Sequence, residues 1–294
     1  MSRFLRAALI GGSFMLASAP VADATFPGAN GKIVFASARD GDNEVFVMDA
    51  GGENQSQLTF NSATDEDLGF SADGERIVFR SNLDGDTEIF VMNVDGSDQT
   101  QLTFNSVADL DPAFSSDGRI AFTSNRDGDQ EIFVMNADGS DQTQLTFNSA
   151  GDNRPAFSPA GRIAFTSNRD GDQEIFVMNA DGSDQTQLTF NAAAEGDSTF
   201  SPDGERIAFR SNGDGDDEIF VMDADGQNPT PLTADPASDA APAFSPDGQR
   251  IAFMSSRDGD DEIFVMDADG QNQIPLTTNA VNDEDPDWQP LNPP

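Results

Sequence analysis

The sequence predicts an all-β protein, a six-bladed β-propeller of four-stranded antiparallel blades that is closed by pairing of its N- and C-terminal strands. A motif of the form Asp-Gly-Asp-x-Glu occurs six times at intervals of 43 or 44 residues, and this period is typical of one propeller blade. Gly, Pro or Asp interrupts each unit every six to nine residues, which disfavours long helices. The 24 Phe of the 294 residues indicate a packed core despite the high charge.

The N-terminal segment has the features of a secretory signal peptide. Arg3 and Arg6 precede a short apolar run, Ala7 to Ala19, and Ala22-Asp23-Ala24 has the small-x-small form of a cleavage site. We therefore expect residues 1–24 to be a signal peptide and residues 25–294 to be a single propeller domain, secreted to the periplasm or the extracellular space. The alternative interpretation of this segment is a buried N-terminal helix.

Each unit contains four short strand signals, which are clearest in the fourth unit. They are Pro155–Ser158, Arg162–Ser167, Glu174–Met178 and Thr186–Phe190. The third segment is continuously apolar, which predicts burial on both of its faces between neighbouring blades. The fourth segment is polar and is expected to form the outer edge of the blade.

The two ends of the repeat region complement each other. The first unit begins directly at a second-strand signal, Lys32–Phe35, and has no first strand before it. After the last unit, residues 282–290 resemble a first strand with no others following. We expect these two segments to pair, so that five complete blades and one blade assembled from both termini close the ring without an exposed edge.

The repeated phrases resemble those of a known family. They are Phe244-Ser245-Pro246-Asp247-Gly248, Arg250-Ile251-Ala252-Phe253, Arg257-Asp258-Gly259, Glu262-Ile263-Phe264-Val265-Met266-Asp267 and Pro275-Leu276-Thr277. They are similar to the WD40-like (PD40) repeat of TolB-type six-bladed propellers, and the resemblance extends over residues 26–290. The resemblance implies the propeller fold, and it implies protein binding as one mode of action. Only residues 25–31 separate the expected cleavage site from the first strand, so we expect no TolB-type N-terminal domain.

Composition restricts the possible functions. The chain has 53 acidic and 15 basic residues, so its formal net charge is −38, which disfavours nucleic acid and anionic membranes as partners. It has no Cys and no His, so it has no disulfide, no thiolate nucleophile, no Ser-His-Asp triad and no imidazole zinc site. We expect a monomer without membrane insertion whose partner is a basic protein, a peptide or a cation.

The repeated motif is also a candidate calcium site, because its carboxylates at positions i, i+2 and i+4 can surround a hard cation. The alternative interpretation is structural: Asp-Gly forms a turn, and the Glu accepts hydrogen bonds from loop N–H groups or pairs with the preceding Arg. Two copies, around Asp86 and Asp216, lack that Arg, so the negative charge of their carboxylates is less well compensated within the chain. The candidate ligands are Asp40, Asp42, Glu44, Asp84, Asp86, Glu88, Asp127, Asp129, Glu131, Asp170, Asp172, Glu174, Asp214, Asp216, Glu218, Asp258, Asp260 and Glu262.

A second acidic set precedes the first strand of each blade and is expected on the same face of the disc as the repeated motif. An alternative explanation for this acidity is a solubilising or halophilic surface. The set comprises Asp65, Glu66, Asp67, Asp109, Asp111, Asp152, Glu195, Asp197, Asp239, Asp283, Glu284 and Asp285.

These observations favour a secreted, non-enzymatic propeller that acts as a platform for binding a protein or a ligand at an acidic face. A calcium-binding propeller is one alternative, with calcium as its only cofactor. A carboxylate-based, glycan-active enzyme is the other, since two acids can suffice for glycoside hydrolysis. Catalytic sites normally break the symmetry of a repeat protein, yet the residues that differ between blades do not form an acid–base set; they are Arg80, Arg210, Met254 and Trp288.

Overall fold

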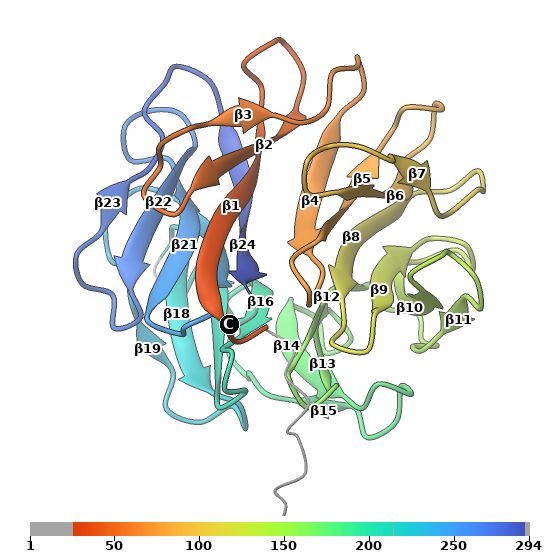
Figure 1. Ribbon diagram of the computed structural model, residues 1–294. Coiled ribbons are helices and arrows are strands. Elements are labelled where there is room, and N and C mark those ends of the chain that lie inside the picture. The colour runs from red at the N-terminus through yellow and green to blue at the C-terminus, as the bar shows by residue number, and fades with distance from the viewer. Residues whose placement is uncertain (1–25, 214, 292–294) are drawn as a thin grey trace, which may run out of the picture.

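The computed structural model describes residues 26–213 and 215–291. The expected signal peptide, residues 1–24, lies outside this range. The described residues form twenty-four strands in six four-stranded antiparallel sheets, which stand around a central axis as the blades of a propeller (Figure 1). They contain no helix with the length and apolar character needed to cross a membrane.

Each blade contributes one strand to each of four concentric layers. The innermost strands are β24 (Asp283–Leu291), β4 (Asp65–Phe70), β8 (Asp109–Phe114), β12 (Asp152–Phe157), β16 (Glu195–Phe200) and β20 (Asp239–Phe244). The second strands are β1 (Ala29–Ser37), β5 (Arg76–Ser81), β9 (Arg119–Ser124), β13 (Ile163–Ser167), β17 (Arg206–Ser211) and β21 (Arg250–Ser255). The third strands are β2 (Glu44–Asp49), β6 (Glu88–Asn93), β10 (Glu131–Asn136), β14 (Glu174–Met178), β18 (Glu218–Asp223) and β22 (Glu262–Asp267). The outermost strands are β3 (Ser56–Gln57), β7 (Thr100–Gln101), β11 (Thr143–Gln144), β15 (Thr186–Gln187), β19 (Thr230–Pro231) and β23 (Ile274–Pro275).

The terminal strands close the ring, as the sequence predicts. The first sheet has the order β24-β1-β2-β3, and the other five sheets follow the order of the chain. The red β1 and the blue β24 lie side by side in Figure 1, and their ladder pairs Ile33 with Trp288 and Ser37 with Asp283. No blade edge is left open by the chain termini.

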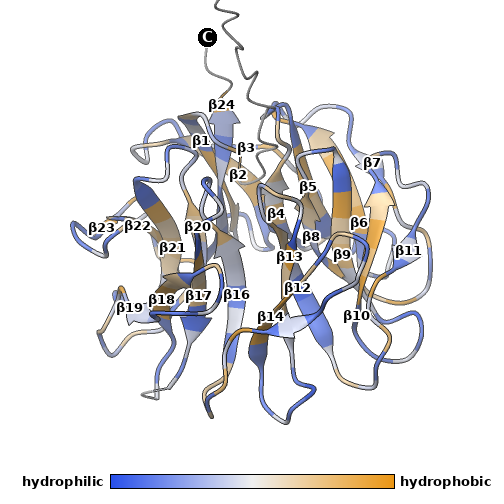
Figure 2. Cartoon of the chain, turned by 90° about the horizontal axis from the view of Figure 1, so that it is seen from below, coloured by the Kyte–Doolittle hydropathy of each residue, from blue (hydrophilic) through white to orange (hydrophobic). Residues whose placement is uncertain are grey.

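The core consists of six apolar clusters, each of which is shared by two neighbouring blades. The third strands supply continuous apolar runs, which are buried on both faces except at Phe220 and Val221 of β18, and Figure 2 shows this apolar character along β6. Every blade also pairs a Phe of its second strand with a Phe of its third strand at a ring-centroid distance of 5.7 or 5.8 Å. Burial between blades therefore stabilises the fold without disulfides.

The innermost strands begin earlier than the sequence predicts. The strand expected at Pro155–Ser158 is observed as β12, which starts at Asp152 and pairs Asp152 with Ser167. Acidic residues are normally depleted in strands, so the sequence pattern places them in a preceding loop. A β-bulge between Asn153 and Ala156 accommodates the polar segment, and equivalent irregularities occur in the other five blades.

The outermost strands are shorter than expected. The predicted strand Thr186–Phe190 is observed as β15, Thr186–Gln187. Beyond it, Leu188 N still donates to Ile175 O at 2.8 Å, but Ile175 N donates to the side-chain Oγ1 of Thr189 at 2.9 Å. A threonine hydroxyl thus replaces the next backbone carbonyl, and the chain leaves the ladder to reach the following blade.

Candidate functional site

The bulge in each innermost strand directs one residue towards the central channel. These six residues have positive φ angles between 49° and 54°, a conformation that is uncommon for residues with a Cβ and that occurs often at functional sites. They are Asp67, Asp111, Arg154, Asp197, Ala241 and Asp285. Proline follows this position in four of the six blades. Proline has no N–H to donate to a neighbouring strand, and it is tolerated here because the bulge interrupts the hydrogen-bond ladder.

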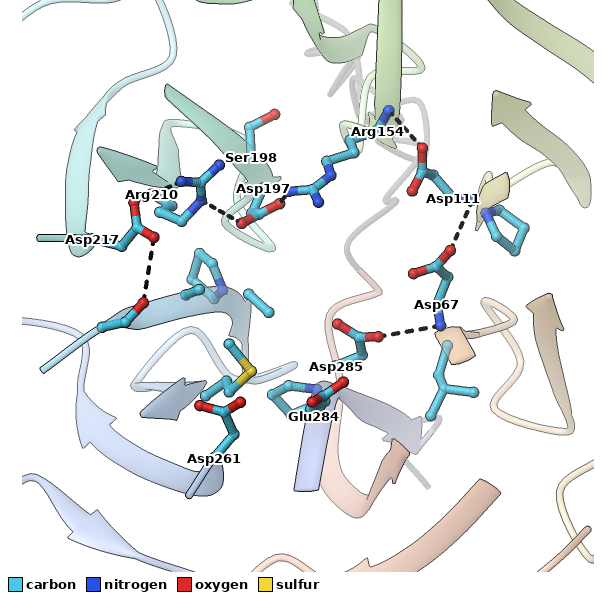
Figure 3. Close-up of a pocket in the computed structure, with 18 of the residues that line it drawn as sticks. Asp67, Asp111, Arg154, Asp197, Ser198, Arg210, Asp217, Asp261, Glu284 and Asp285 are labelled. Atoms are coloured by element: carbon cyan, nitrogen blue, oxygen red, sulfur yellow. Dashed lines mark hydrogen bonds and ion pairs between the residues drawn. The ribbon is translucent and has the colours of Figure 1, made fainter. Parts of the chain in front are cut away.

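Consecutive blades are linked through these residues by hydrogen bonds from backbone to side chain. Asp285 Oδ2 accepts from Asp67 N at 3.3 Å, and Asp67 Oδ2 accepts from Asp111 N at 3.2 Å. Asp111 Oδ2 accepts from Arg154 N at 3.3 Å. The carboxylates therefore form a continuous arc around half of the channel mouth (Figure 3).

The arc ends where arginines enter the channel. Arg154 forms an ion pair with Asp197. Arg210 binds the same carboxylate through Nε at 2.8 Å and Asp217 through Nη1 at 2.7 Å. Figure 3 shows this arginine-bearing side across the opening from Asp261, Glu284 and Asp285. The mouth is therefore polarised, with cations on one side and unpaired acids on the other.

The opening is a cavity of about 450 Å³, within the size range of small-ligand sites. Seven of its lining residues are acidic and two are basic, so its net charge is negative. The acids are Asp67, Asp111, Asp197, Asp217, Asp261, Glu284 and Asp285, and the bases are Arg154 and Arg210.

The acids at the channel mouth are buried and close together, and both effects raise their pKa values. Burial, together with the charges of Asp111 and Asp285, raises the pKa of Asp67 well above its usual range, although Arg80 Nε lies 2.5 Å from Asp67 Oδ2. Burial, with a smaller contribution from Glu284, raises the pKa of Asp285 to about 6. Burial is also the main cause of the raised pKa of Glu284 and of Asp261. A cation placed among these groups would favour their ionised forms.

The second acidic set of the sequence analysis is thus divided between two locations. Its channel members are Asp67, Asp111, Asp197, Glu284 and Asp285, whereas the first acid of each innermost strand is buried between blades. Glu66 belongs to neither group and forms an ion pair with Arg80. The sequence singled out Arg80, Arg210 and Met254 as breaking the repeat but did not place them at the channel. Their facing strand partners are Glu66, Gly196 and Ala240, and Trp288 instead belongs to the core.

Sequence reasoning missed Arg154. Aligning the six units on their repeated motif would have shown an Arg where four other units carry Asp, and this is the signal that could have found it.

The predicted calcium ligands have a common arrangement within the part of the chain that the structure describes. The first Asp of each motif is exposed, the second is half-buried, and the Glu is buried at the start of the third strand. Asp214 lies outside the described residues. In five blades the Glu accepts a hydrogen bond from a loop N–H, such as Asn148 N to Glu131 Oε1 at 2.7 Å and Asn191 N to Glu174 Oε1 at 2.9 Å.

Two of these loops bring three carboxylates together. Oxygen atoms of the three acids lie within 4.8 Å of one another in the sets Asp127, Asp129, Glu131 and Asp170, Asp172, Glu174. The Asp84–Glu88 loop, which lacks the preceding Arg, is not among the described groups that converge in this way. The preceding Arg does not meet the motif Glu: Arg169 Nη2 instead donates to Asp152 Oδ2 at 2.7 Å.

The comparisons with known proteins identify the family. The model of the TolB β-propeller domain matches residues 16–119, 106–198 and 193–292. The chain belongs to the TolB β-propeller family. This TolB-family propeller has no similar sequence among the curated proteins compared.

Solved structures share its fold at low sequence identity. TolB from Acinetobacter baumannii is 22% identical with a TM-score of 0.80, and the match covers 91% of this chain and 69% of that one. A putative TolB from Agrobacterium tumefaciens is 20% identical with a TM-score of 0.70 over 91% and 94% of the two chains. A chain of the hydrazine synthase of Kuenenia stuttgartiensis is 17% identical with a TM-score of 0.77 over 90% and 47%. The fold thus occurs both in TolB and in an enzyme, so it does not decide the function.

Proposed function

We propose that this TolB-family propeller is an exported, monomeric binding protein without catalytic activity, whose acidic channel mouth receives a cationic group of a partner protein or peptide. The observation that carries the proposal is the arc of Asp285, Asp67 and Asp111 carboxylates around the 450 Å³ opening. Concave sites lined by charges of one sign concentrate ligands of the opposite sign. Export is inferred from the signal-peptide features of residues 1–24.

The channel carboxylates are engaged in ways that suit binding better than proton transfer. Asp285, Asp67 and Asp111 hold the backbone of the next blade, and Asp197 is paired with two arginines. Asp261 and Glu284 have no ion pair among the described residues. These two side chains can therefore meet a ligand cation without breaking an internal ion pair.

Substituting these two acids tests the proposal. We expect the double variant Asp261→Asn and Glu284→Gln to bind a hexalysine peptide roughly fivefold more weakly at physiological salt, because two charge contacts of modest strength are lost. Isothermal titration calorimetry measures this. The control changes two exposed acids at turns of the opposite face, Glu75→Gln and Glu205→Gln. An equal loss of affinity in the control would assign binding to overall charge and refute a site at the mouth.

Calcium binding is a second candidate function, favoured by the convergence of carboxylates in the Asp127–Glu131 and Asp170–Glu174 loops. Glu131 and Glu174 are buried, and one oxygen of each has no hydrogen-bond partner among the described residues. Calcium accepts six to eight oxygen ligands in flexible geometry, which suits such loops better than the strict octahedron of magnesium.

A stability measurement tests the calcium sites. Calcium at a hundredfold excess over Kd should stabilise the folded state by about 2.7 kcal/mol per occupied site if it binds that state alone. The variant Asp129→Asn with Asp172→Asn should lose this gain in a thermal denaturation assay, whereas Asp86→Asn, in a loop without the converging triad, should keep it. Equal stabilisation by calcium, magnesium and sodium chloride at matched ionic strength would leave charge screening as the explanation.

A further inference from the structure

Four blades contain the same arrangement of a partly buried arginine. In each, an Arg that follows the second strand lies over the Phe pair of its own blade, with its guanidinium carbon 4.5 to 5.5 Å from the ring centroids. Its Nη2 also donates to the first carboxylate of the innermost strand at 2.7 Å. The four pairs are Arg39–Asp283, Arg126–Asp109, Arg169–Asp152 and Arg257–Asp239.

The guanidinium group has further donors that are satisfied within the blade. Nε donates to a Ser hydroxyl at the end of the second strand at 2.8 or 2.9 Å in three of the blades. Nη1 donates to a Gln side chain at 2.6 or 2.7 Å in all four. A carboxylate, a hydroxyl and two aromatic faces thus form a complete binding site for a planar cation.

The blade of β16 to β19 has this site without its arginine. Gly213 occupies the position of the Arg, while the carboxylate, the hydroxyl and the aromatic pair are present as Glu195, Ser211, Phe209 and Phe220. Glu195 is 2% exposed. Its Oε1 accepts from Asn191 at 2.5 Å and from Ser211 at 3.3 Å, and its Oε2 has no partner among the described residues.

The missing side chain leaves a cavity. A space of about 680 Å³ is lined by Glu195, Ser211, Gly213 and both Phe rings, among other residues. Phe220 is only partly buried, whereas its counterparts in the other five blades are 4–7% exposed. Pro229 stands where the other blades have the Gln that binds Nη1, and it also lines the cavity. Phe220 is therefore accessible from outside the blade, whereas Phe209 lines the cavity but is only 1% exposed.

A second acid adjoins the free carboxylate. Burial, with a contribution from Glu195, raises the pKa of Glu174 to about 7. In the four arginine-bearing blades a fixed cation offsets the equivalent negative charge. Here none of the described residues supplies one, so an external cation would favour the ionised form of both acids.

We propose that the cavity beside Gly213 binds a guanidinium group supplied from outside the chain. The protein itself shows this arrangement four times, in three of them with the serine contact, and three of the four kinds of contacting group are retained in this blade. A planar guanidinium stacks on the Phe220 ring while binding the carboxylate, which a compact ammonium group does less well. The site is separate from the channel mouth, and the inference does not rest on the function proposed there.

Filling the cavity from within tests the proposal. The variant Gly213→Arg should restore the internal arrangement, because a Cβ at this position has its nearest contact, Ala193 Cβ, at an ordinary 3.5 Å. Isothermal titration calorimetry with N-acetylarginine amide should show one site in the wild type, at least about tenfold weaker in Gly213→Arg. Gln249→Arg adds the same charge at a turn of the opposite face and should leave binding unchanged. Undiminished binding in Gly213→Arg, or no saturable binding by the wild type, would overturn the proposal.

Further arms identify the chemistry and the source of the ligand. N-acetyllysine amide should bind at least about tenfold more weakly than the arginine compound, and equal binding would overturn the assignment to guanidinium. If methylguanidinium binds as tightly as an arginine-containing pentapeptide, the ligand is a free guanidinium compound. If the peptide binds more tightly, the ligand is an arginine of a partner protein.

The variant Arg169→Gly provides the test if Gly213→Arg fails to fold. It opens the same cavity one blade earlier, so the number of guanidinium groups bound per protein should rise from one to two. A folded Arg169→Gly protein that still binds one equivalent would contradict the proposal.

Discussion

Deleting residues 283–294 should abolish cooperative folding or cause aggregation, and this is the largest effect expected of any change to the chain. The deletion removes β24, the innermost strand of the first blade, and exposes the ladder groups of β1 between Ala29 and Ser37. It also removes Trp288, which is 3% exposed and packs in the cluster shared with the sixth blade. An open hydrophobic strand edge is a template for association between chains.

A complementation experiment distinguishes loss of closure from general damage. Adding a synthetic peptide of residues 283–291 to the truncated chain should restore a thermal transition monitored by circular dichroism, and a scrambled peptide should not. The full-length variant Trp288→Ala keeps the strand and should lose about 3–5 kcal/mol of unfolding free energy, as expected for removing a buried aromatic side chain. A truncated chain that melts like the full one would show that pairing of the termini does not hold the ring together.

The sequence predicts the propeller well because its evidence is local and repeated. The 43- to 44-residue period, the apolar third strands and the first-strand character of residues 282–290 each follow from patterns in the chain, and the structure confirms them. The early start of the innermost strands does not follow from such patterns. Asp152 is typical of a turn, and only its ladder with Ser167 and the ring of neighbouring blades place it in a strand.

The channel site depends on tertiary structure in the same way. Arg80 and Arg210 stand out in the sequence as departures from the repeat, but which face they occupy is set by their pairing with Glu66 and Gly196 beside the bulges. The missing arginine at Gly213 is equally visible in the sequence. Its consequence is not, because the sequence does not reveal that the equivalent arginines cover a Phe pair.

The boundaries between blades therefore determine much of the chemistry of this protein. At each boundary a Glu of one third strand approaches the first acid of the next innermost strand, as the influence of Asp65 on Glu44 and of Glu195 on Glu174 shows. Four of these boundaries also hold an arginine, and two do not. Each blade boundary thus contains a pair of acids, and neutralisation of their charge by a proton, an arginine or a bound cation contributes to the stability of the fold.

Raising the pH from about 5 to about 8 should destabilise the protein. Burial is the largest cause that raises the pKa of Glu44, Glu174, Glu218 and Glu262 to about 7, and that of Asp285 and Asp287 to about 6. In the unfolded chain these groups titrate near 4.5 and 3.8, so between about pH 4 and 7 the folded state binds more protons than the unfolded state. Stability then falls as pH rises through this window. The chain has no His or Cys, so the change of charge in this window comes almost entirely from carboxyl groups with raised pKa values.

The expected loss between pH 5 and 8 is at least about 3 kcal/mol, since a raised pKa unit corresponds to about 1.4 kcal/mol and six groups contribute. For a domain of this size, that lowers the melting temperature by roughly 10 °C. Glu218→Gln keeps an acceptor for the Thr233 hydroxyl and removes one titrating group, so its melting temperature should exceed that of the wild type at pH 8 and depend less on pH. Glu205→Gln, an exposed change of equal charge, should leave the slope as it is. A melting temperature that rises from pH 5 to 8 at constant ionic strength would contradict burial of proton-binding carboxyls between the blades.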